Sequence, residues 1–546
     1  MRTGDGSFDD MVQMTRSLQL TAKQIKEGSA VIPKYRALFI DSQMKESISV
    51  KTDKDKNFKA LIRNMKTIED NDYDIPRELD GVLRSYQKYG FMWIKTLCHN
   101  GFGGILADDM GLGKTLQIIA FLKSEYAENE SGEKRSIIIC PASLVYNWKY
   151  EIDRFAPELP VKMVIGNADN RKMVINNMEE RVIVVTSYDL LRRDIDLYED
   201  INFFCQVIDE AQYIKNHNTQ SSRAVKAVKS GFRMALTGTP VENRLSELHS
   251  IFDYLMPGFL YSYKRFREEL EVPIVTEGDE YAMERLRKMI NPFVLRRLKK
   301  DVLKDLPDKI ENNMYFEMEG EQAELYEAHV QRIKLMLDNS RDEEFKNSKI
   351  QILAELTKLR QLCCDPGLLY EDYHSESGKI DMCMHIVDDA AASGHKILLF
   401  SQFTTMLERL EEALKDKGIS YYTLTGATPK EKRIEMVENF NKDDVSVFCI
   451  SLKAGGTGLN LTAADIVIHF DPWWNVAVQN QATDRAHRIG QKKVVNVYKL
   501  IAKNSIEENI VRLQERKNEL ADSILGGEGI GSGSFSKEEL LQLLQY

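Results

Sequence analysis

The stretch Leu106-Ala107-Asp108-Asp109-Met110-Gly111-Leu112-Gly113-Lys114-Thr115 decides the fold class of this chain. It follows a short apolar run and precedes a helical pattern over 116–122, so a strand, a glycine-rich turn and a helix follow one another. This order is typical of a phosphate-binding turn, because the turn and the helix N-terminus direct backbone N–H groups toward a polyphosphate. Gly111 and Gly113 have no Cβ, which lets the backbone approach the phosphates. We expect Lys114 to reach the β- and γ-phosphates and Thr115 to ligate Mg²⁺.

Length and composition indicate a globular protein of several domains. A chain of 546 residues is too long for one hydrophobic core, and 43% hydrophobic and 29% charged residues are ordinary for a soluble protein. No apolar run is long enough to cross a membrane, and Met1 to Asp10 contain no apolar signal segment, so we expect a cytoplasmic protein. The seven cysteines form no Cys-x-x-Cys pair, which favours reduced core residues over a metal site. The net charge of −10 argues against a generally basic surface, although one groove can still be positive.

Two sets of short apolar runs alternate with helical patterns, which favours an α/β fold with two lobes. Nearly continuous runs of Val, Ile, Leu and Phe suit strands buried on both faces, as in parallel sheets flanked by helices. In the first lobe, expected over 79–262, the runs are 104–107, 136–140, 182–186, 203–209 and 233–237. In the second lobe, expected over 373–515, they are 396–400, 421–424, 445–450, 466–470 and 494–500. Only the first lobe contains a phosphate-binding turn.

Three further segments accompany the lobes. Residues 1–78 carry mixed charge and weak periodicity, so we expect an accessory domain or the end of a larger upstream region. Residues 263–372 are expected to be mainly helical insertions that connect the lobes. Within them, a leucine-rich stripe over 352–362 has helical spacing and favours a helix–helix core, and Pro366 ends the pattern. A flexible linker and a short helix are expected over 516–546.

Two strand ends in the first lobe carry polar residues suited to phosphate chemistry. One run ends in Asp209 and Glu210. Asp209 can hold Mg²⁺ through water, and Glu210 can orient or deprotonate the attacking water. The next run ends in Leu236-Thr237-Gly238-Thr239-Pro240, whose hydroxyls could sense the γ-phosphate or the second lobe. A threonine-rich turn is the alternative interpretation of that segment.

The most specific feature of the second lobe is Gln481-Ala482-Thr483-Asp484-Arg485-Ala486-His487-Arg488-Ile489-Gly490-Gln491. Arg485 and Arg488 would share one face of a helix, about 4.5 Å apart along its axis. Two guanidinium groups at that spacing suit the charge that develops on a γ-phosphate, as arginine fingers from the opposite lobe. The alternative is a solvated basic helix face.

Three features are candidates for nucleic-acid contact. A loop after a second-lobe strand combines glycines, a hydroxyl and an amide, which suits backbone contact with a phosphodiester. Its candidate residues are Lys453, Gly455, Gly456, Thr457 and Asn460. Trp473 and Trp474 follow, and such residues are more often core aromatics than base-stacking platforms. Arg296 and Arg297 begin a basic cluster that is either a solvated surface or a surface that tracks phosphates.

These blocks, in this order, resemble the Swi/Snf family of ATPases in helicase superfamily 2. The resemblance covers about 79–515 and is most specific in 108–115, 236–240 and 483–491. It implies two RecA-like lobes that close on ATP and Mg²⁺, grip double-stranded DNA and move along it without separating the strands, as a monomeric motor. With little beyond the motor, the chain resembles bacterial members, which would act at the nucleoid, or a motor cut from a longer member.

The resemblance also implies roles for individual residues. ATP would be bound by Tyr86, Gln87, Asp109, Met110, Gly111, Leu112, Gly113, Lys114 and Thr115, with Mg²⁺ on Thr115 and Asp209. The catalytic residues would be Lys114, Asp209, Glu210, Arg485 and Arg488, and those that couple the lobes would be Gln212, Thr237, Thr239 and Gln481. Besides the loop, Trp474 and the basic cluster, the expected DNA contacts are Pro141, Ser143, Thr186, Ser187 and Gln402. Many members have His where this chain has Gln212, so we expect altered coupling rather than lost hydrolysis.

Three functions fit these blocks. The leading hypothesis is a DNA-stimulated ATPase that translocates on duplex DNA and displaces or repositions bound protein. The second is a strand-separating helicase or a motor that recycles RNA polymerase, although no wedge element is recognisable. The third is an ATP-dependent clamp or scaffold that binds DNA without translocating.

Overall fold

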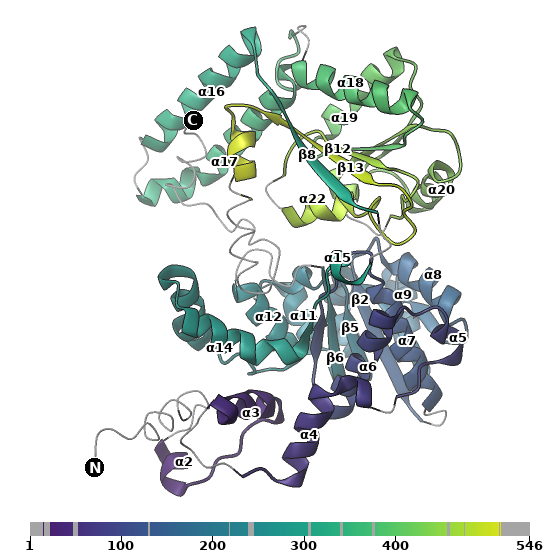
Figure 1. The fold of residues 1–546 in the computed structure, drawn as a ribbon, viewed down its shortest axis with the longest axis vertical. Coiled ribbons are helices and arrows are strands. Elements are labelled where there is room, and N and C mark those ends of the chain that lie inside the picture. Colours follow the sequence, from purple (N-terminus) through teal and green to yellow (C-terminus); the bar gives the residue numbers. More distant parts are fainter. Residues whose placement is uncertain are drawn as a thin grey trace. The chain divides into compact units, whose positions relative to one another are not determined.

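The computed structural model describes residues 15, 22–46, 53–71, 73–128, 132–217, 219–238, 245–303, 307–338, 342–373, 377–455, 459–473, 476–512 and 514. The chain divides into two compact units, and each is described by itself (Figure 1). The first unit comprises Met1–Asp109, Gly113–Pro240 and Leu245–Leu298, and the second comprises Met110–Leu112, Val241–Arg244 and Lys299–Tyr546. The linker and helix expected over 516–546 lie outside the described residues.

A seven-stranded parallel sheet forms the centre of the first unit, in the order β3-β4-β2-β5-β6-β1-β7. All five strands predicted for this lobe are present, and their inner parts are buried because helices cover both faces. The strands are β1 (Gly104–Leu106), β2 (Lys134–Cys140), β3 (Val161–Met163), β4 (Arg181–Ser187), β5 (Asn202–Ile208), β6 (Lys229–Leu236) and β7 (Val294–Leu295). The sequence did not predict β3 and β7, because these short strands are only partly buried, unlike the equally short but fully buried β1.

The helices of the first unit begin and end at local signals. Asn167 caps α9, Thr219 caps α11 and Asp279 caps α14, in each case by accepting a hydrogen bond from a backbone N–H of the first turn. The helices are α2 (Ala22–Glu27), α3 (Ala37–Glu46), α4 (Lys56–Lys66), α5 (Arg77–Asp80), α6 (Ser85–Asn100), α7 (Lys114–Glu128), α8 (Val145–Phe155), α9 (Ala168–Asn176), α10 (Tyr188–Arg193), α11 (Gln220–Ala227), α12 (Leu245–Leu255), α13 (Tyr263–Phe266) and α14 (Glu280–Ile290). The helix predicted after the glycine-rich turn is α7.

A six-stranded parallel sheet forms the centre of the second unit, in the order β10-β11-β9-β12-β13-β8. The strands are β8 (Lys309–Phe316), β9 (Ile397–Ser401), β10 (Tyr421–Leu424), β11 (Val447–Ser451), β12 (Ile466–His469) and β13 (Val495–Ala502). The five predicted strands are present. The sixth, β8, lies in the segment expected to be mainly helical and pairs with β13 from Lys309↔Val495 to Phe316↔Ala502. Half of its residues are polar and most are exposed, so the strand depends on its pairing with β13 rather than on a long apolar run.

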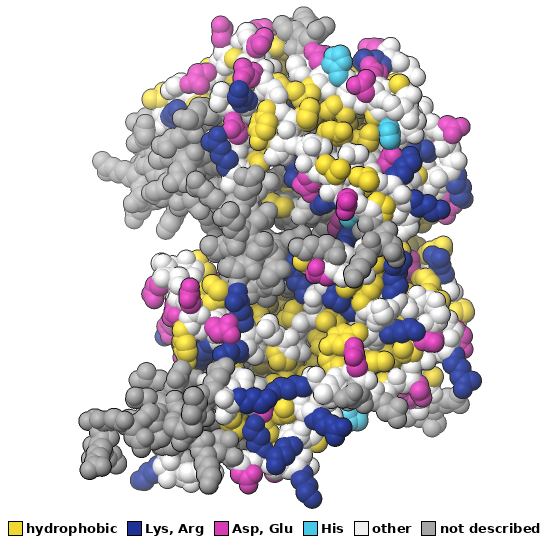
Figure 2. Space-filling model, viewed as in Figure 1, with side chains coloured by type: hydrophobic (Ala, Val, Ile, Leu, Met, Phe, Trp, Pro, Cys, Tyr) yellow, Lys and Arg dark blue, Asp and Glu magenta, His cyan; other side chains and the backbone are white. Residues whose placement is uncertain are grey.

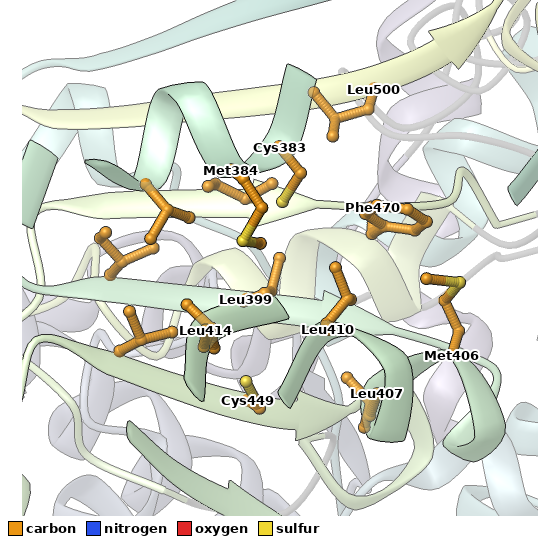
Figure 3. Packing of buried hydrophobic residues seen from close by; sticks show 14 of the residues in the cluster. Cys383, Met384, Leu399, Met406, Leu407, Leu410, Leu414, Cys449, Phe470 and Leu500 are labelled. Atoms are coloured by element: carbon orange, nitrogen blue, oxygen red, sulfur yellow. The ribbon is translucent and has the colours of Figure 1, made fainter. Parts of the chain in front are cut away.

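Helices pack on the second sheet and enclose its core. Figure 3 shows Cys383 and Met384 of α18 and Leu407 and Leu410 of α19 facing the sheet residue Leu399. The helices are α15 (Lys299–Val302), α16 (Gly320–Asp338), α17 (Asp342–Cys364), α18 (Gly378–Ala392), α19 (Thr404–Asp416), α20 (Lys430–Phe440), α21 (Leu452–Gly455) and α22 (Val476–Thr483). The predicted leucine-rich stripe lies on α17 and is buried with residues of α16, which confirms a helix–helix core.

The described residues include no helix that combines the length and the apolar character needed to cross a bilayer.

Candidate nucleotide and nucleic-acid site

The candidate nucleotide-binding residues of the first unit gather at one edge of its sheet. Parallel strands end at the same edge, and there β1 leads into the glycine-rich turn, β5 into Asp209 and β6 into Thr237. The register pairs Leu106 with Leu236, so the strands β1 and β6 end level. Crevices at the carboxyl ends of parallel strands are the usual ligand sites of open α/β sheets.

The glycine-rich turn has the backbone that a phosphate cradle requires. Gly111 and Gly113 have φ angles of 87° and 77°, a region that residues with a Cβ avoid. A Cβ on Gly113 would also collide with the side-chain amide of Gln87. The ammonium of Lys114 donates to the carbonyls of Asp108 at 2.5 Å and Asp109 at 3.4 Å, which are neutral acceptors that a phosphate can replace. The backbone of the turn therefore has the conformation that a phosphate cradle needs, and phosphate binding stays a prediction.

Asp209 is held in a shielded position after β5. The indole Nε1 of Trp148 donates to its Oδ2 at 2.9 Å, and the N–H of Glu210 donates to its Oδ1 at 2.9 Å. Burial, and then the Glu210 carboxylate, raise the pKa of Asp209 to about 7, against the lowering effects of Trp148 and Lys114. A carboxylate that is costly to charge when alone is a fitting ligand for a divalent cation, which offsets its charge.

Glu210 begins a hydrogen-bonded path along the same edge. Its φ and ψ are 53° and 59°, a left-handed conformation that is uncommon for a residue with a side chain. Gln212 donates from Nε2 to Oε2 of Glu210 at 2.8 Å, and Thr237 donates from Oγ1 to Oε1 of Gln212 at 3.3 Å. The structure thus brings together Glu210, Gln212 and Thr237, three residues predicted separately from two strand ends. Thr239 lies outside the described residues.

A buried polar cluster lies behind the turn and corrects one expectation. The guanidinium of Arg297 donates from Nε to Oδ1 of Asp108 at 2.8 Å and from Nη2 to Oε1 of Gln117 at 2.7 Å. It also bonds the carbonyl of Tyr86 and lies 5.1 Å from the centre of the Tyr86 ring. Asp108 is fully buried. Arg297 was expected to contact DNA with Arg296, but here its guanidinium faces the interior because β7 places it beside the turn.

Two other first-unit candidates for DNA contact also point inward. Thr186 is buried at the end of β4, and its hydroxyl donates to the carbonyl of Val164 at 3.1 Å. Ser187 is buried and caps α10, where its Oγ accepts from the N–H of Leu190 at 3.3 Å. Both hydroxyls are used to build the unit, which differs from the expected surface role. Pro141 is buried after β2, whereas Ser143 is partly exposed.

In the second unit, the two candidate arginines do not share a helix face. The helix α22 ends at Thr483, and Arg485 and Arg488 follow in turns, so the predicted helical spacing was wrong. The hydroxyl of Thr483, the last helical residue, hydrogen-bonds the ring of His469 at 2.8 Å. Arg485 is buried, whereas Arg488 is partly exposed and donates from Nη1 to the carbonyl of Leu459 at 3.2 Å.

Other second-unit candidates lie at the carboxyl ends of neighbouring strands. Ser401 of β9 pairs with Ser451 of β11, so Gln402 and α21, which includes Lys453 and Gly455, follow at the same edge. The N–H of Gln402 donates to Oδ1 of Asp471 at 3.1 Å. The remaining candidates are the exposed Asn460, the partly exposed α22 residue Gln481, and Gly456, Thr457 and Trp474, which lie outside the described residues.

Several residues that support the site were not found from the sequence. Trp148, Gln117 and Asp471 lie between the recognised blocks, and their roles depend on contacts between distant segments. Lys299 donates to Oδ1 of Asp484 at 2.6 Å and to the carbonyl of His487 at 2.5 Å, which fixes the turn that carries Arg488. A basic cluster in a sequence does not reveal which of its members will be buried.

Comparison with known proteins gives relatives along almost the whole chain. One relative is a putative ATP-dependent helicase/translocase of Bacillus subtilis. It is 38% identical over 88% of this chain and 53% of its own length. Another is the TATA-binding protein-associated factor mot1 of Schizosaccharomyces pombe. It is 34% identical over 99% of this chain and 31% of its own length. The chain spans about half the length of the bacterial relatives it matches.

A solved structure is also similar in sequence. It is the Sulfolobus solfataricus SWI2/SNF2 ATPase core in complex with dsDNA, with 38% identity over 87% of this chain and 98% of that chain, and a TM-score of 0.42.

Three family models match the chain in succession. They are bacterial SNF2 helicase associated over 4–76, SNF2-related domain over 86–368 and helicase conserved C-terminal domain over 378–490. The first match falls on the segment for which the sequence predicted only an accessory domain or upstream remnant. The second spans more than half of the chain, and the predicted class of ATP-dependent enzyme agrees with it. The chain therefore belongs to the SNF2 family.

Proposed function

We propose that this chain is a DNA-stimulated ATPase that translocates on double-stranded DNA and displaces or repositions bound protein without separating the strands. The observation that carries the proposal is the path from Glu210 through Gln212 to Thr237. It joins the carboxylate beside the phosphate-binding turn to the end of β6, and in this proposal it couples the two. The names of the relatives, a helicase/translocase and a TATA-binding protein-associated factor, favour DNA as the substrate.

In this proposal the first unit holds the nucleotide. Bound ATP and Mg²⁺ supply the phosphoanhydride bond and the cation that offsets its charge. Lys114 and the N–H groups of the turn hold the phosphates, Thr115 and Asp209 hold the cation, and Tyr86 with Gln87 border the adenine. Glu210 orients the attacking water and accepts its proton.

The second unit is proposed to contribute the arginines. A guanidinium placed against charge that develops only in the transition state speeds hydrolysis without tightening substrate binding. Arg488 suits this role because its bond to the carbonyl of Leu459 is to a neutral acceptor, which a phosphate oxygen can replace. Arg485 is buried, so its proposed role requires a rearrangement of the turn.

The DNA backbone is proposed to lie on loops at the carboxyl ends of both sheets. Ser143 in the first unit and Gln402 and Lys453 in the second follow strand ends in this structure, whereas Asn460 precedes β12 and accepts a hydrogen bond from Asn441. The protein would act in the cytoplasm at the nucleoid. RNA polymerase is one DNA-bound protein that such a motor could meet.

The first test is the rate of ATP hydrolysis with and without duplex DNA. The proposal predicts stimulation by duplex DNA, and the Glu210→Gln variant should bind nucleotide but not hydrolyse it. Intact nucleotide binding with no stimulation by DNA would contradict the proposal.

The second test separates translocation from strand separation. Displacement of the third strand of a triplex, without unwinding of a forked duplex, is the expected pattern. Unwinding of the fork would favour a strand-separating helicase. Activity retained in full by Glu210→Gln would favour a clamp that does not translocate.

A further inference from the structure

The exposed face of α4 carries a stripe of positive charge. Lys56, Lys59, Arg63 and Lys66 are all exposed and recur at intervals of three, four and three residues, so they share one face of the helix. The helix contains no acidic residue. Figure 2 shows Lys and Arg side chains gathered over this part of the first unit. The stripe stands out because the whole chain has a net charge of −10.

A second group of lysines adjoins the stripe and surrounds one buried carboxylate. Asp41 is almost fully buried and accepts ion pairs from Lys54 at 2.5 Å, Lys66 at 2.5 Å and Lys45 at 3.6 Å. One carboxylate thus faces three ammonium groups. The Lys66 ammonium lowers the pKa of Lys45, as expected where cations crowd together.

The opposite face of α4 is committed to packing. Ile62 and Met65 are buried, and the helix lies against α3 and α6. Asn71 ties its end to α6 by donating to the carbonyl of Asn64 at 3.0 Å and to Oγ1 of Thr96 at 2.9 Å. Because the apolar face is not free to enter a bilayer, the stripe does not suit an amphipathic membrane helix.

From these observations we infer that the basic face of α4 is a second DNA contact, which binds the phosphate backbone of duplex DNA. The inference rests on the proposed function for the identity of the polyanion. The four cations span about 15 Å of helix axis, a length over which a duplex carries roughly nine phosphate charges. The contact is independent of base sequence, since Lys and Arg on a helix face meet phosphates and not base edges. This contact gives the segment 4–76 a role in DNA binding, in addition to the hydrolysis of ATP by the rest of the chain.

The test uses the full chain with Lys56→Ala, Lys59→Ala and Arg63→Ala combined, which spares the paired Lys66. The dissociation constant for a labelled blunt duplex is measured at several salt concentrations. We expect binding weakened at least tenfold and a slope of log K against log salt that is smaller by about 2.7, or 0.9 per lost contact. ATP hydrolysis without DNA, and the rate at saturating DNA, should be unchanged.

A matched control removes the same charge elsewhere on the first unit. Lys172→Ala, Arg193→Ala and Lys229→Ala combined change three exposed cations on three separate elements. If the control weakens duplex binding as much as the α4 variant, or if the α4 variant binds like the unmodified chain, the inference is wrong. Loss of binding to phosphatidylserine vesicles with duplex binding retained would also overturn it, in favour of a membrane surface. In each of these three outcomes, stimulation of the unmodified chain by DNA would show that the inference fails while the proposed function stands.

Discussion

The indole of Trp148 on α8 and the carboxylate of Asp209 after β5 are joined by a hydrogen bond of 2.9 Å, although 61 residues separate them in the chain. The only other described donor to this carboxylate is the N–H of Glu210, which bonds Oδ1, so the two bonds together fix the orientation of the carboxylate. A partner that orients a metal ligand usually matters almost as much as the ligand itself.

Trp148→Phe keeps the ring but removes this bond. Loss of such a partner typically costs about 10–100-fold in metal affinity or activity. We therefore expect the Mg²⁺ concentration for half-maximal hydrolysis to rise about tenfold. A titration of ATPase rate with Mg²⁺ measures it. Trp93→Phe, which removes an indole bond to the carbonyl of Pro292, is the control for loss of a buried indole. An unchanged Mg²⁺ requirement in Trp148→Phe would show that the indole does not orient the ligand.

Gln212→Ala breaks the path between Glu210 and Thr237. Both carboxylate and turn stay in place, so hydrolysis without DNA should change little. Stimulation by duplex DNA should fall by up to about thirtyfold, since two hydrogen bonds of about 1 kcal/mol each are lost. The ratio of rates with and without DNA is the readout. A variant whose stimulation equals that of the unmodified chain would show that the path does not transmit the signal.

Gln212→His introduces the residue that many family members have. Imidazole can donate to Glu210, so the path should survive, but the new group titrates near neutral pH. DNA stimulation should then gain a further pH-dependent step between about 6 and 7, in addition to any dependence that Asp209 gives both proteins. Identical pH profiles for the two proteins would contradict the assignment.

Arg297→Lys keeps the charge beside Asp108 but loses the planar fork that reaches Asp108, Gln117 and Tyr86 at once. ATP affinity should fall about tenfold, because the turn and the start of α6 lose their common support. Arg171→Lys, at the buried pair with Asp194, breaks an equivalent fork elsewhere in the first unit. It should lower the melting temperature without changing ATP affinity. Equal affinity losses in both variants would assign Arg297 to general stability only.

His469 makes the second unit sensitive to acid. Burial, and then Lys499, lower its pKa to about 3 from 6.5, so the folded unit holds the neutral ring that bonds Thr483. Between about pH 3 and pH 6.5, His469 is protonated in the unfolded chain but neutral in the folded chain. Stability from this group is present above pH 6.5 and is lost as pH falls toward 3, by about 2 kcal/mol at pH 5. His469→Asn should be less stable at pH 8 but lose less on acidification, as measured by urea unfolding. A steeper acid loss in the variant would contradict this.

The sequence predicted what depends on local pattern. All ten strands inferred from apolar runs are present, and so are the helix after the glycine-rich turn and the buried stripe of α17. These features are readable because burial on both faces of a sheet, or on one face of a helix, imposes a period that neighbouring residues share.

The features that the sequence did not predict depend on contacts between distant segments. Strand β8 mixes polar with apolar residues, is largely exposed, and lies at the edge of its sheet with β13 as its described partner. The sequence predicted that Arg297 and Thr186 lie on the surface. In the structure Arg297 bonds the carboxylate of Asp108, and Thr186 bonds the carbonyl of Val164, both in the interior. The helix expected under Arg485 and Arg488 ends at Thr483, where His469 bonds the side chain. None of these partners is adjacent in sequence, so the local sequence pattern does not reveal the contacts.

In the proposed mechanism Lys114 binds the nucleotide, whereas Arg488 acts only in the transition state. The most direct test measures ATP binding and DNA-stimulated hydrolysis in parallel for Lys114→Ala and Arg488→Ala. We predict that Lys114→Ala loses nucleotide binding, whereas Arg488→Ala binds ATP normally and hydrolyses it about 10³-fold more slowly. Equal loss of ATP binding in the two variants, or an unchanged hydrolysis rate in Arg488→Ala, would contradict the account.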